Sequence, residues 1–302
     1  MAYPLEREQQ QRRLIVNADD FGLTSGVNRA ILELNAAGVL TSATLMASGA
    51  AFRSAAHAAF VQPSLGVGCH IVLVDGAPVL HASEIPSLAT AEGFRSSLST
   101  FALDLVRGRI RSSDIEREAI AQIRRLQSAG ITVSHVDTHK HTHMFPRVLR
   151  PLLRAAVACG VSAMRNPFEP AWALRATRAP IGRRIQVHLL KLYRGQFLRA
   201  VRRAGLLTTE GAVGVLATGT LDAAALERLL AAMPAGTWEL VCHPGYDDAA
   251  LAAMRTRLTA SRETERAALL QVLPSASGIR LIHFEQLAFP GLEQITQDSD
   301  PR

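Results

Sequence analysis

Four histidines and one aspartate are concentrated in a single stretch near the middle of this chain. The segment 134–145 has the sequence SHVDTHKHTHMF, and the whole chain contains only ten histidines. Imidazole nitrogens and carboxylate oxygens are common ligands of zinc, and a catalytic zinc site uses three of them while one position stays open. The stretch therefore predicts a metal site.

Two backbone geometries would bring these side chains together. In a helix, only pairs four residues apart, such as His139 and His143, share a face. On an extended strand, alternation places every second residue on one face: His135, Asp137, His139, His141 and His143. Several nitrogens converge in either case, so the prediction of a metal site does not depend on the choice.

Two adjacent carboxylates, Asp19 and Asp20, follow the first apolar run of the chain, residues 14–16. Neighbouring carboxylates repel each other unless a cation or a shared proton holds them together. We therefore expect one of them to be a metal ligand and the other a base. An Asx turn in which Gly22 helps the chain to reverse is the alternative interpretation.

His70 and His243 each lie at the end of another predicted strand. His70 by itself could be a core histidine with its hydrogen bonds satisfied, but it directly precedes a long irregular segment, as a site residue would. Cys69 and Cys242 each precede one of these histidines. Because neighbours on a strand face opposite sides, we expect both sulfurs to pack in the core and not to bind metal.

Arg165 also lies at a predicted strand end, in the sequence MRNP. Its guanidinium could bind an oxygen of a substrate or pair with Asp19. A plain surface arginine is the alternative.

Short apolar segments alternate with amphipathic ones along the chain, which predicts an α/β fold built around a parallel sheet or barrel. We expect a single domain over residues 13–290, with a flexible N-terminal tail at 1–12 and a C-terminal tail at 291–302. The irregular segment 75–94 is long enough to be a lid or a substrate loop. Strands are expected near residues 14–16, 40–46, 65–74, 131–133, 161–165, 213–217, 238–242 and 279–283. Helices are expected at 27–37, 50–60, 114–128, 147–159, 183–204, 222–233 and 258–273.

Composition is that of an ordinary globular protein. The chain has 302 residues, of which 48% are hydrophobic and 20% charged, enough to bury a large core. It contains no apolar run near the roughly 18 residues that a membrane span needs, and residues 1–13 lack the apolar core of a signal peptide. Three cysteines without a CxxC pair suit a reducing compartment, so we expect a cytoplasmic protein.

The predicted helix 183–204 carries seven arginines and lysines and no acidic residue. One hypothesis is that it rests on anionic lipid at the inner face of the membrane, where each basic residue contributes about 1 kcal/mol. The alternative is a helix that covers the barrel and exposes a solvated basic side. We expect no nucleic-acid partner, and a homodimer stays open.

Several motifs in order resemble the YdjC-like carbohydrate deacetylases over about residues 13–285. The segment VLVDGAPVL (72–80), followed by SEIPSL (83–88), is similar to the hopanoid-biosynthesis-associated branch called HpnK. The motifs that carry the family resemblance are LIVNADDFGL (14–23), GCHIVLVDGAPVL (68–80), HVDTHKHTHMFP (135–146), MRNP (164–167) and CHPG (242–245).

The resemblance implies a distorted (β/α) barrel similar to the polysaccharide deacetylases. It also implies one divalent metal held by Asp20, His70 and His139, with Asp19 as the base and His243 as the general acid. This donor set suits zinc better than Mg, and Ni, Co or Mn could also bind. Four further residues would orient the metal ligands or contact the substrate: His135, His141, His143 and Arg165. The family often has a further histidine where Lys140 stands here.

For the hopanoid branch, the resemblance implies removal of an acetyl group from an N-acetylglucosaminyl lipid, a precursor of glucosamine-linked bacteriohopanetetrol. Alternatives are a deacetylase of soluble chito-oligosaccharides and a non-catalytic lipid- or sugar-binding partner of the pathway. A metal phosphoesterase would need more carboxylates, bridging two metals about 3.5–4 Å apart.

Overall fold

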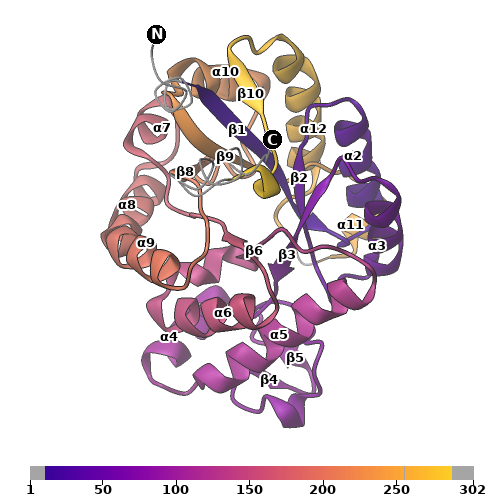
Figure 1. Ribbon diagram of the computed structural model, residues 1–302, viewed down its shortest axis with the longest axis vertical. Helices are drawn as coiled ribbons and strands as arrows, with labels where there is room; N and C mark the ends of the chain where they lie inside the picture. The colour runs from indigo at the N-terminus through magenta and orange to yellow at the C-terminus, as the bar shows by residue number, and fades with distance from the viewer. Residues whose placement is uncertain (1–10, 255, 288–302) are drawn as a thin grey trace, which may run out of the picture.

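A curled parallel β-sheet forms the centre of the molecule, and helices surround it (Figure 1). The computed structural model describes residues 11–254 and 256–287. Eight strands follow the order β7-β6-β3-β2-β1-β9-β8, with β10 beside the start of β1. Their bounds are β1 Arg12–Phe21, β2 Ser42–Leu45, β3 Gly66–Ile71, β6 His135–Thr138, β7 Ala163–Met164, β8 Gly211–Val213, β9 Gly236–Cys242 and β10 Ile279–Leu281. The predicted α/β fold with a single barrel-like domain is confirmed in the form of a half-barrel.

Strand β1 is the spine of the sheet. It pairs with β9 along one edge from Arg12 to Ala18, and with β10 and then β2 along the other. From Leu14 to Phe21 its residues are buried, as expected for a parallel strand whose two faces are both covered. The strand extends well past the predicted 14–16 and ends beyond the two aspartates.

The helices lie outside the sheet and pack their apolar faces against it. Thr24 caps the first of them by accepting a hydrogen bond from the backbone N–H of Val27, and Asp222 caps α10 in the same way. The α-helices are α2 Ser25–Ala36, α3 Phe52–Val61, α4 Leu98–Val106, α5 Ser112–Ser128, α6 Pro146–Ala158, α7 Ala171–Ala176, α8 Ile181–Leu190, α9 Arg194–Arg203, α10 Ala223–Ala232, α11 Ala249–Ala252 and α12 Ala260–Val272. Short 3₁₀ turns are η1 Ala82–Glu84, η2 His139–Met144, η3 Lys191–Tyr193, η4 Leu273–Ser275 and η5 Phe284–Gln286.

The predicted basic helix 183–204 is not continuous. It consists of α8 and α9 joined by the 3₁₀ turn η3, a common connection between helical segments. Leu190 and Arg194 on either side keep right-handed helical dihedral angles, so the interruption tightens the winding without adding a loop. The side chains of Arg183, Gln186 and Leu189 lie outside the described part of the chain.

The histidine segment adopts neither of the two predicted geometries. Only His135–Thr138 is a strand, and a 3₁₀ turn follows in which Lys140 and His141 have φ angles of 55° and 52°. These left-handed residues reverse the direction of the chain. The turn then folds back, so that the Thr138 hydroxyl accepts a hydrogen bond from the backbone N–H of His143 at 3.0 Å. His135 and Asp137 therefore share one face of a strand, as predicted. The three histidines that follow lie in the turn and do not continue that face.

The irregular segment 75–94 is anchored to helix α5. It contains η1 and a small antiparallel hairpin, β4 Ala89–Thr90 with β5 Gly93–Phe94. Buried Glu118 accepts hydrogen bonds from the backbone N–H groups of Val79 and Leu80 at 2.7 and 3.1 Å. A role as lid or substrate loop stays a prediction.

Strand β1 includes Arg12, so the predicted N-terminal tail ends earlier than residue 12. The rest of that tail up to residue 10, and the predicted C-terminal tail, lie outside the described residues. Among the helices that the structure describes, none has the length and apolar character needed to cross a bilayer.

Candidate metal centre

Asp20, His70 and His139 converge at the carboxyl ends of β1, β3 and β6. Their nearest donor atoms lie within 4.8 Å of one another. Asp20 Oδ1 is 3.6 Å from His70 Nε2 and 3.5 Å from His139 Nδ1. Ligands that surround zinc tetrahedrally at about 2.0–2.2 Å are about 3.4 Å apart. The spacing of these three donors therefore suits a metal ion of this size.

An irregularity in β1 brings Asp19 and Asp20 into the same site. A regular strand would point neighbouring side chains to opposite faces. The register with β2 shifts between Ala18 and Phe21, and Asp20 has a left-handed φ of 64°. Aspartate tolerates this conformation better than most residues. The distortion turns the Asp20 carboxylate toward His70 and His139.

Arg262 of helix α12 holds the second oxygen of Asp20. Its Nη2 lies 2.5 Å from Asp20 Oδ2, and both groups are buried. Burial raises the pKa of Asp20, but the charge of Arg262 and the hydrogen bond from His139 outweigh it and keep that pKa well below its usual value. Asp20 is thus an anion with one oxygen engaged and the other directed at two imidazoles.

Asp137 orients His70. His70 Nδ1 lies 2.8 Å from Asp137 Oδ1, which leaves Nε2 to face Asp20. Such a carboxylate on the far nitrogen is the usual support of a metal-binding histidine. Burial lowers the pKa of His70, but Asp137 more than compensates and raises it to about 9.

Arg165 lies behind the site and is surrounded by carboxylates. It donates to both oxygens of Asp19, at 2.9 and 2.6 Å, to Glu239 at 2.7 Å, and it also pairs with Asp137. Its side chain is 0% exposed. Of the two roles predicted for Arg165, pairing with Asp19 is therefore the one observed. Each nitrogen of the guanidinium has a carboxylate partner in the fold, and binding of a substrate oxygen stays a prediction.

The same pairing sets the charge of Asp19. Burial raises the pKa of Asp19, but the charge and hydrogen bonds of Arg165 together with the charge of His70 hold it far below the ordinary value. Asp19, His70 and Asp137 also lie close enough to bind a cation. Arg165 already contacts both of those carboxylates, so a guanidinium supplies the positive charge there.

His243 approaches Asp19 from the end of β9. Its Nε2 is 3.7 Å from Asp19 Oδ2. The backbone N–H of His243 donates to Glu265 at 2.6 Å, and the Nδ1 atom is 3.9 Å from the same carboxylate. Cys242, next to it, is fully buried, as is Cys69, and neither belongs to the two groups of side chains with metal-binding spacing.

The other three histidines of the segment do not converge with the donor cluster. His135 stacks on Phe284 with ring centroids 3.6 Å apart, and it lies so close to Gly68 that a Cβ there would be 2.5 Å from its ring. His143 pairs with the Thr138 hydroxyl at 2.6 Å. His135 and His143 are both 0% exposed, so they contact the protein's own side chains. Burial lowers the pKa of His141 to about 3, with Arg165 adding to this, which leaves its ring neutral.

The charges around the cluster suit a bound cation. Two buried guanidiniums, Arg165 and Arg262, are accompanied by four buried carboxylates besides Glu239, whose pKa burial raises to about 8. An excess of buried negative charge is costly unless a cation offsets it. The side chain of His139 remains 22% exposed, which leaves the site open on that side. The four carboxylates are Asp19, Asp20, Asp137 and Glu265.

The chain matches a known protein family over a region that runs from the second residue of β1 through β9 and contains the donor cluster. A family model described as YdjC-like protein matches residues 13–273, most of the chain. The chain belongs to the YdjC-like family. The predicted family resemblance is therefore confirmed, while placement in the hopanoid branch stays a prediction.

Relatives of this YdjC-like protein are named carbohydrate deacetylases. One from Geobacillus stearothermophilus is 35% identical over 241 residues, which cover 80% of this chain and 82% of that one. One from Brevibacillus brevis is 42% identical over 144 residues, 48% of this chain and 55% of the relative, so that match spans about half its length.

A solved structure shares the fold. A protein from Enterococcus faecalis V583, named for cellobiose-phosphate cleavage, superposes with a TM-score of 0.70 at 25% identity. The superposition covers 92% of this YdjC-like chain and 100% of the other.

The supporting roles of four residues around the ligands were not predicted from the sequence, although Asp137 was expected to lie on the same face as the histidines. Asp137 and Glu239 were within reach, since Asp137 lies in the histidine segment and Glu239 is a lone acid in an apolar strand, which needs a buried partner. Arg262 and Glu265 gave no signal, because they lie in the middle of an amphipathic helix with many other charged residues.

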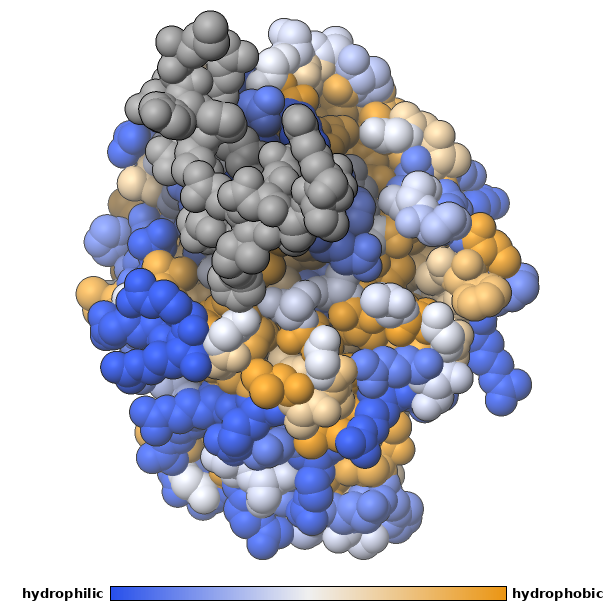
Figure 2. Space-filling model, viewed as in Figure 1, coloured by the Kyte–Doolittle hydropathy of each residue, from blue (hydrophilic) through white to orange (hydrophobic). Residues whose placement is uncertain are grey.

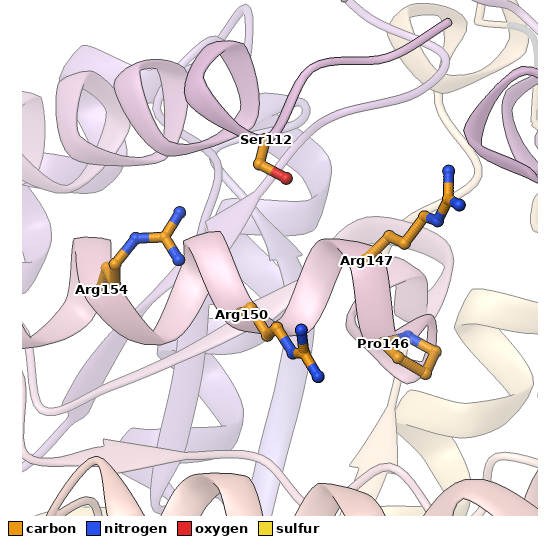
Figure 3. Close-up of a pocket in the computed structure, with 5 residues that line it drawn as sticks. All are labelled: Ser112, Pro146, Arg147, Arg150 and Arg154. Atoms are coloured by element: carbon orange, nitrogen blue, oxygen red, sulfur yellow. The ribbon is translucent and has the colours of Figure 1, made fainter. Parts of the chain in front are cut away.

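A surface pocket of about 370 Å³ lies apart from the metal cluster, between the start of α5 and the side of α6 (Figure 3). Two of its three arginines already have partners in the fold. Arg147 donates to the backbone oxygen of Leu105 at 2.8 Å, and Arg154 pairs with Glu116. The pocket contains no carboxylate or imidazole, so it has none of the chemistry of the metal cluster.

Proposed function

We propose that this YdjC-like protein is a metal-dependent hydrolase that removes the N-acetyl group from an N-acetylglucosaminyl substrate. The observation that carries the proposal is the cluster of Asp20, His70 and His139. Asp19 lies beside this cluster as an anionic carboxylate that is not one of the three donors. The names of its relatives, carbohydrate deacetylases, support the same chemistry.

Asp20, His70 and His139 would hold the ion, and zinc suits two imidazoles and a carboxylate. A divalent cation bound there supplies Lewis acidity, which an acetamide and a neutral water both need in order to react near pH 7. His139 contributes the ligand nearest to solvent, so substrate enters on its side.

Asp19 is the proposed general base. Arg165 holds both of its oxygens, which fixes the carboxylate in position and keeps it unprotonated. Asp19 accepts a proton from the water whose oxygen adds to the acetyl carbonyl carbon. Proton transfer by a positioned group typically contributes about 10²–10⁴-fold in rate.

His243 is the proposed general acid. Its Nε2 faces Asp19 across 3.7 Å, so the two groups flank one reaction centre from different strands. When the bond between the acetyl carbon and the sugar nitrogen breaks, the nitrogen leaves as an amine and takes a proton from His243. The products are acetate and a free amino sugar.

We further propose that the sugar is attached to a lipid, as in N-acetylglucosaminyl bacteriohopanetetrol of hopanoid side-chain synthesis. The support is the resemblance of residues 72–80 and 83–88 to the hopanoid branch. Soluble chito-oligosaccharides are the competing substrate class.

Mass spectrometry of the reaction products tests both parts of the proposal. Purified protein loaded with zinc is incubated with N-acetylglucosaminyl lipid and, separately, with chito-oligosaccharides, and the Asp19→Asn variant serves as the control. We expect the lipid to lose one acetyl unit, and the loss to stop under strong chelation. Turnover of chito-oligosaccharides alone would move the substrate to the soluble class. Turnover of neither, with zinc bound, would leave a non-catalytic binding role and overturn the proposal.

A further inference from the structure

The segment 181–193 exposes more large apolar side chains than any comparable stretch of the described chain. Ile181 is 79% exposed, Ile185 55%, Leu192 80% and Tyr193 44%. They are four of the ten exposed large hydrophobic residues in the part of the chain that the structure describes. Single exposed apolar residues need no explanation, but a cluster of them does.

Three of these side chains follow one face of α8 and of the 3₁₀ turn η3 that continues it. Ile181, Ile185 and Leu192 are separated by four and seven residues, the spacing that aligns side chains along an α-helix. A helix that only covers a core turns such a stripe inward. Here the stripe points to solvent instead, and Arg184 and His188 are exposed beside it.

The charge around this stripe has one sign. No acidic residue occurs between Glu169 and Glu210, a stretch with nine arginines and lysines. The exposed basic side chains of α9 join no ion pair among the described residues. Their charges are therefore free to meet an outside partner; they are Arg199, Arg202 and Arg203.

The buried side of α9 leads toward the metal cluster. Phe197 packs against Phe168 and against the ring of His143, with centroids 5.5 and 6.2 Å away. His143 belongs to the turn η2, whose first residue is His139. In Figure 2, hydrophilic side chains dominate over α8 and α9 at the left of the molecule, and a few apolar ones lie beside them. Helix α9, which directly follows the stripe along the chain, thus packs next to the turn that carries His139.

We propose that α8 and α9 form a docking surface for an anionic lipid bilayer. The aliphatic stripe inserts between headgroups, and the arginines contact lipid phosphates around it. Aliphatic residues combined with basic ones, without acids, are typical of helices that lie in a membrane interface. A protein partner would also be expected to meet some acidic residues of this surface, and none is present between Glu169 and Glu210. The benefit to catalysis rests on the proposed lipid-linked substrate, while the docking itself does not.

Vesicle sedimentation of the full chain tests the proposal. The probes are vesicles of phosphatidylcholine alone and of phosphatidylcholine mixed with phosphatidylglycerol in equal parts. We expect the protein to sediment only with the anionic vesicles, and less as salt is raised. Replacing the three α9 arginines with glutamine should weaken partitioning about a hundredfold. Ile181→Ser combined with Leu192→Ser should weaken it about tenfold or more.

Matched variants separate this surface from overall charge and hydrophobicity. Exposed arginines elsewhere, Arg53, Arg107 and Arg124, are replaced with glutamine, and exposed Phe60 and Val106 with serine. These controls should bind vesicles as the unaltered protein does.

Two results would overturn the docking surface. The first is equal binding of both vesicle types, or of neither, by the unaltered protein. The second is a dimer in light scattering that the Ile181→Ser, Leu192→Ser variant converts to monomer, because the stripe would then be an interface between two copies. Deacetylation of a soluble substrate is measured alongside. Vesicle binding without deacetylation would refute the proposed function and leave the docking intact.

Discussion

Asp19 and Asp20 are neighbours in β1 with the same side chain, yet the fold gives them opposite surroundings. Arg165 binds both oxygens of Asp19. Arg262 binds one oxygen of Asp20, and the other faces His70 and His139. One carboxylate is thus held beside the cluster as a fixed anion, and the other is part of it.

The difference shows how a chain can divide two roles between identical residues. A bidentate arginine contacts both oxygens of Asp19 and holds the carboxylate in place, with a second lone pair on each oxygen left to accept a proton, whereas a single contact leaves one whole oxygen of Asp20 free. The backbone adds to the separation, because only Asp20 has the left-handed conformation. Substitutions at and around the two aspartates test whether their roles are separate, and the largest effect is expected at a metal ligand.

His139→Ala should abolish both metal binding and acetate release. The change removes a nitrogen that lies 3.5 Å from Asp20 and leaves two donors where a catalytic zinc site needs three. Bound zinc measured by mass spectrometry should be absent, and activity should fall by more than about 10³-fold. His57→Ala, on the distant helix α3, is the control. A variant that keeps stoichiometric zinc would remove His139 from the ligand set.

Asp19→Asn should keep the metal and lose nearly all turnover. Asparagine retains the shape of the side chain but cannot accept the proton of water, so we expect about 10²–10⁴-fold slower acetate release. Zinc content and acetate release are measured on the same sample. Full turnover in this variant would show that Asp19 is not the base.

Arg165→Lys should lower kcat with little effect on zinc content. Lysine keeps the buried positive charge but replaces the planar fork by a point charge, so Asp19 loses one of its two fixed hydrogen bonds. A small misplacement of a reacting group can cost about 10²-fold, and we expect a loss of this order. An effect on KM alone would contradict a positioning role.

Arg262→Lys should weaken zinc binding and leave kcat at saturating zinc nearly unchanged. The single contact to Asp20 Oδ2 supports a ligand, and loss of such support typically weakens metal binding by about 10–100-fold. Zinc affinity is measured by competition with a chelating dye, and kcat is measured at saturating zinc. If both arginine variants lose kcat equally at saturating zinc, the division between the two aspartates does not hold.

Glu239→Gln should change the pH dependence of stability. Burial raises the pKa of Glu239 to about 8 from a usual value of 4.5, against the charge of Arg165. The proton that Glu239 binds in the folded state adds to the free energy of unfolding. This contribution is fully present below pH 4.5 and is lost as pH rises toward 8. Glutamine cannot titrate, so the stability of the variant relative to the unaltered protein should rise over that interval, by a few kcal/mol at most.

Urea unfolding in the presence of a chelator measures this difference. Glu227→Gln, at an exposed position, is the matched control. A difference that stays constant between pH 5 and pH 8 would show that Glu239 is not protonated beside Arg165.

The sequence by itself determined which strand ends carry the chemistry. Asp20, His70 and His139 each follow an apolar run, and parallel strands deliver their carboxyl ends to one edge of a sheet. A metal site at this edge could therefore be predicted without coordinates, together with the core positions of Cys69 and Cys242, while the choice of Asp20 and His139 as ligands came from the family resemblance. The alternation of segments likewise predicted the parallel sheet.

The sequence offered Arg165 as a possible partner of Asp19, but only the tertiary structure decided between its two predicted roles and paired Arg262 with Asp20. Arg165 lies 146 residues from Asp19 and Arg262 lies 242 residues from Asp20, so these pairs depend on strand register and on where helix α12 packs. The left-handed turn at Lys140 and the outward stripe of α8 were also beyond prediction. Local sequence fixes which groups a segment can offer, but contacts between distant segments fix what each group faces, and these arise only when the whole core is packed.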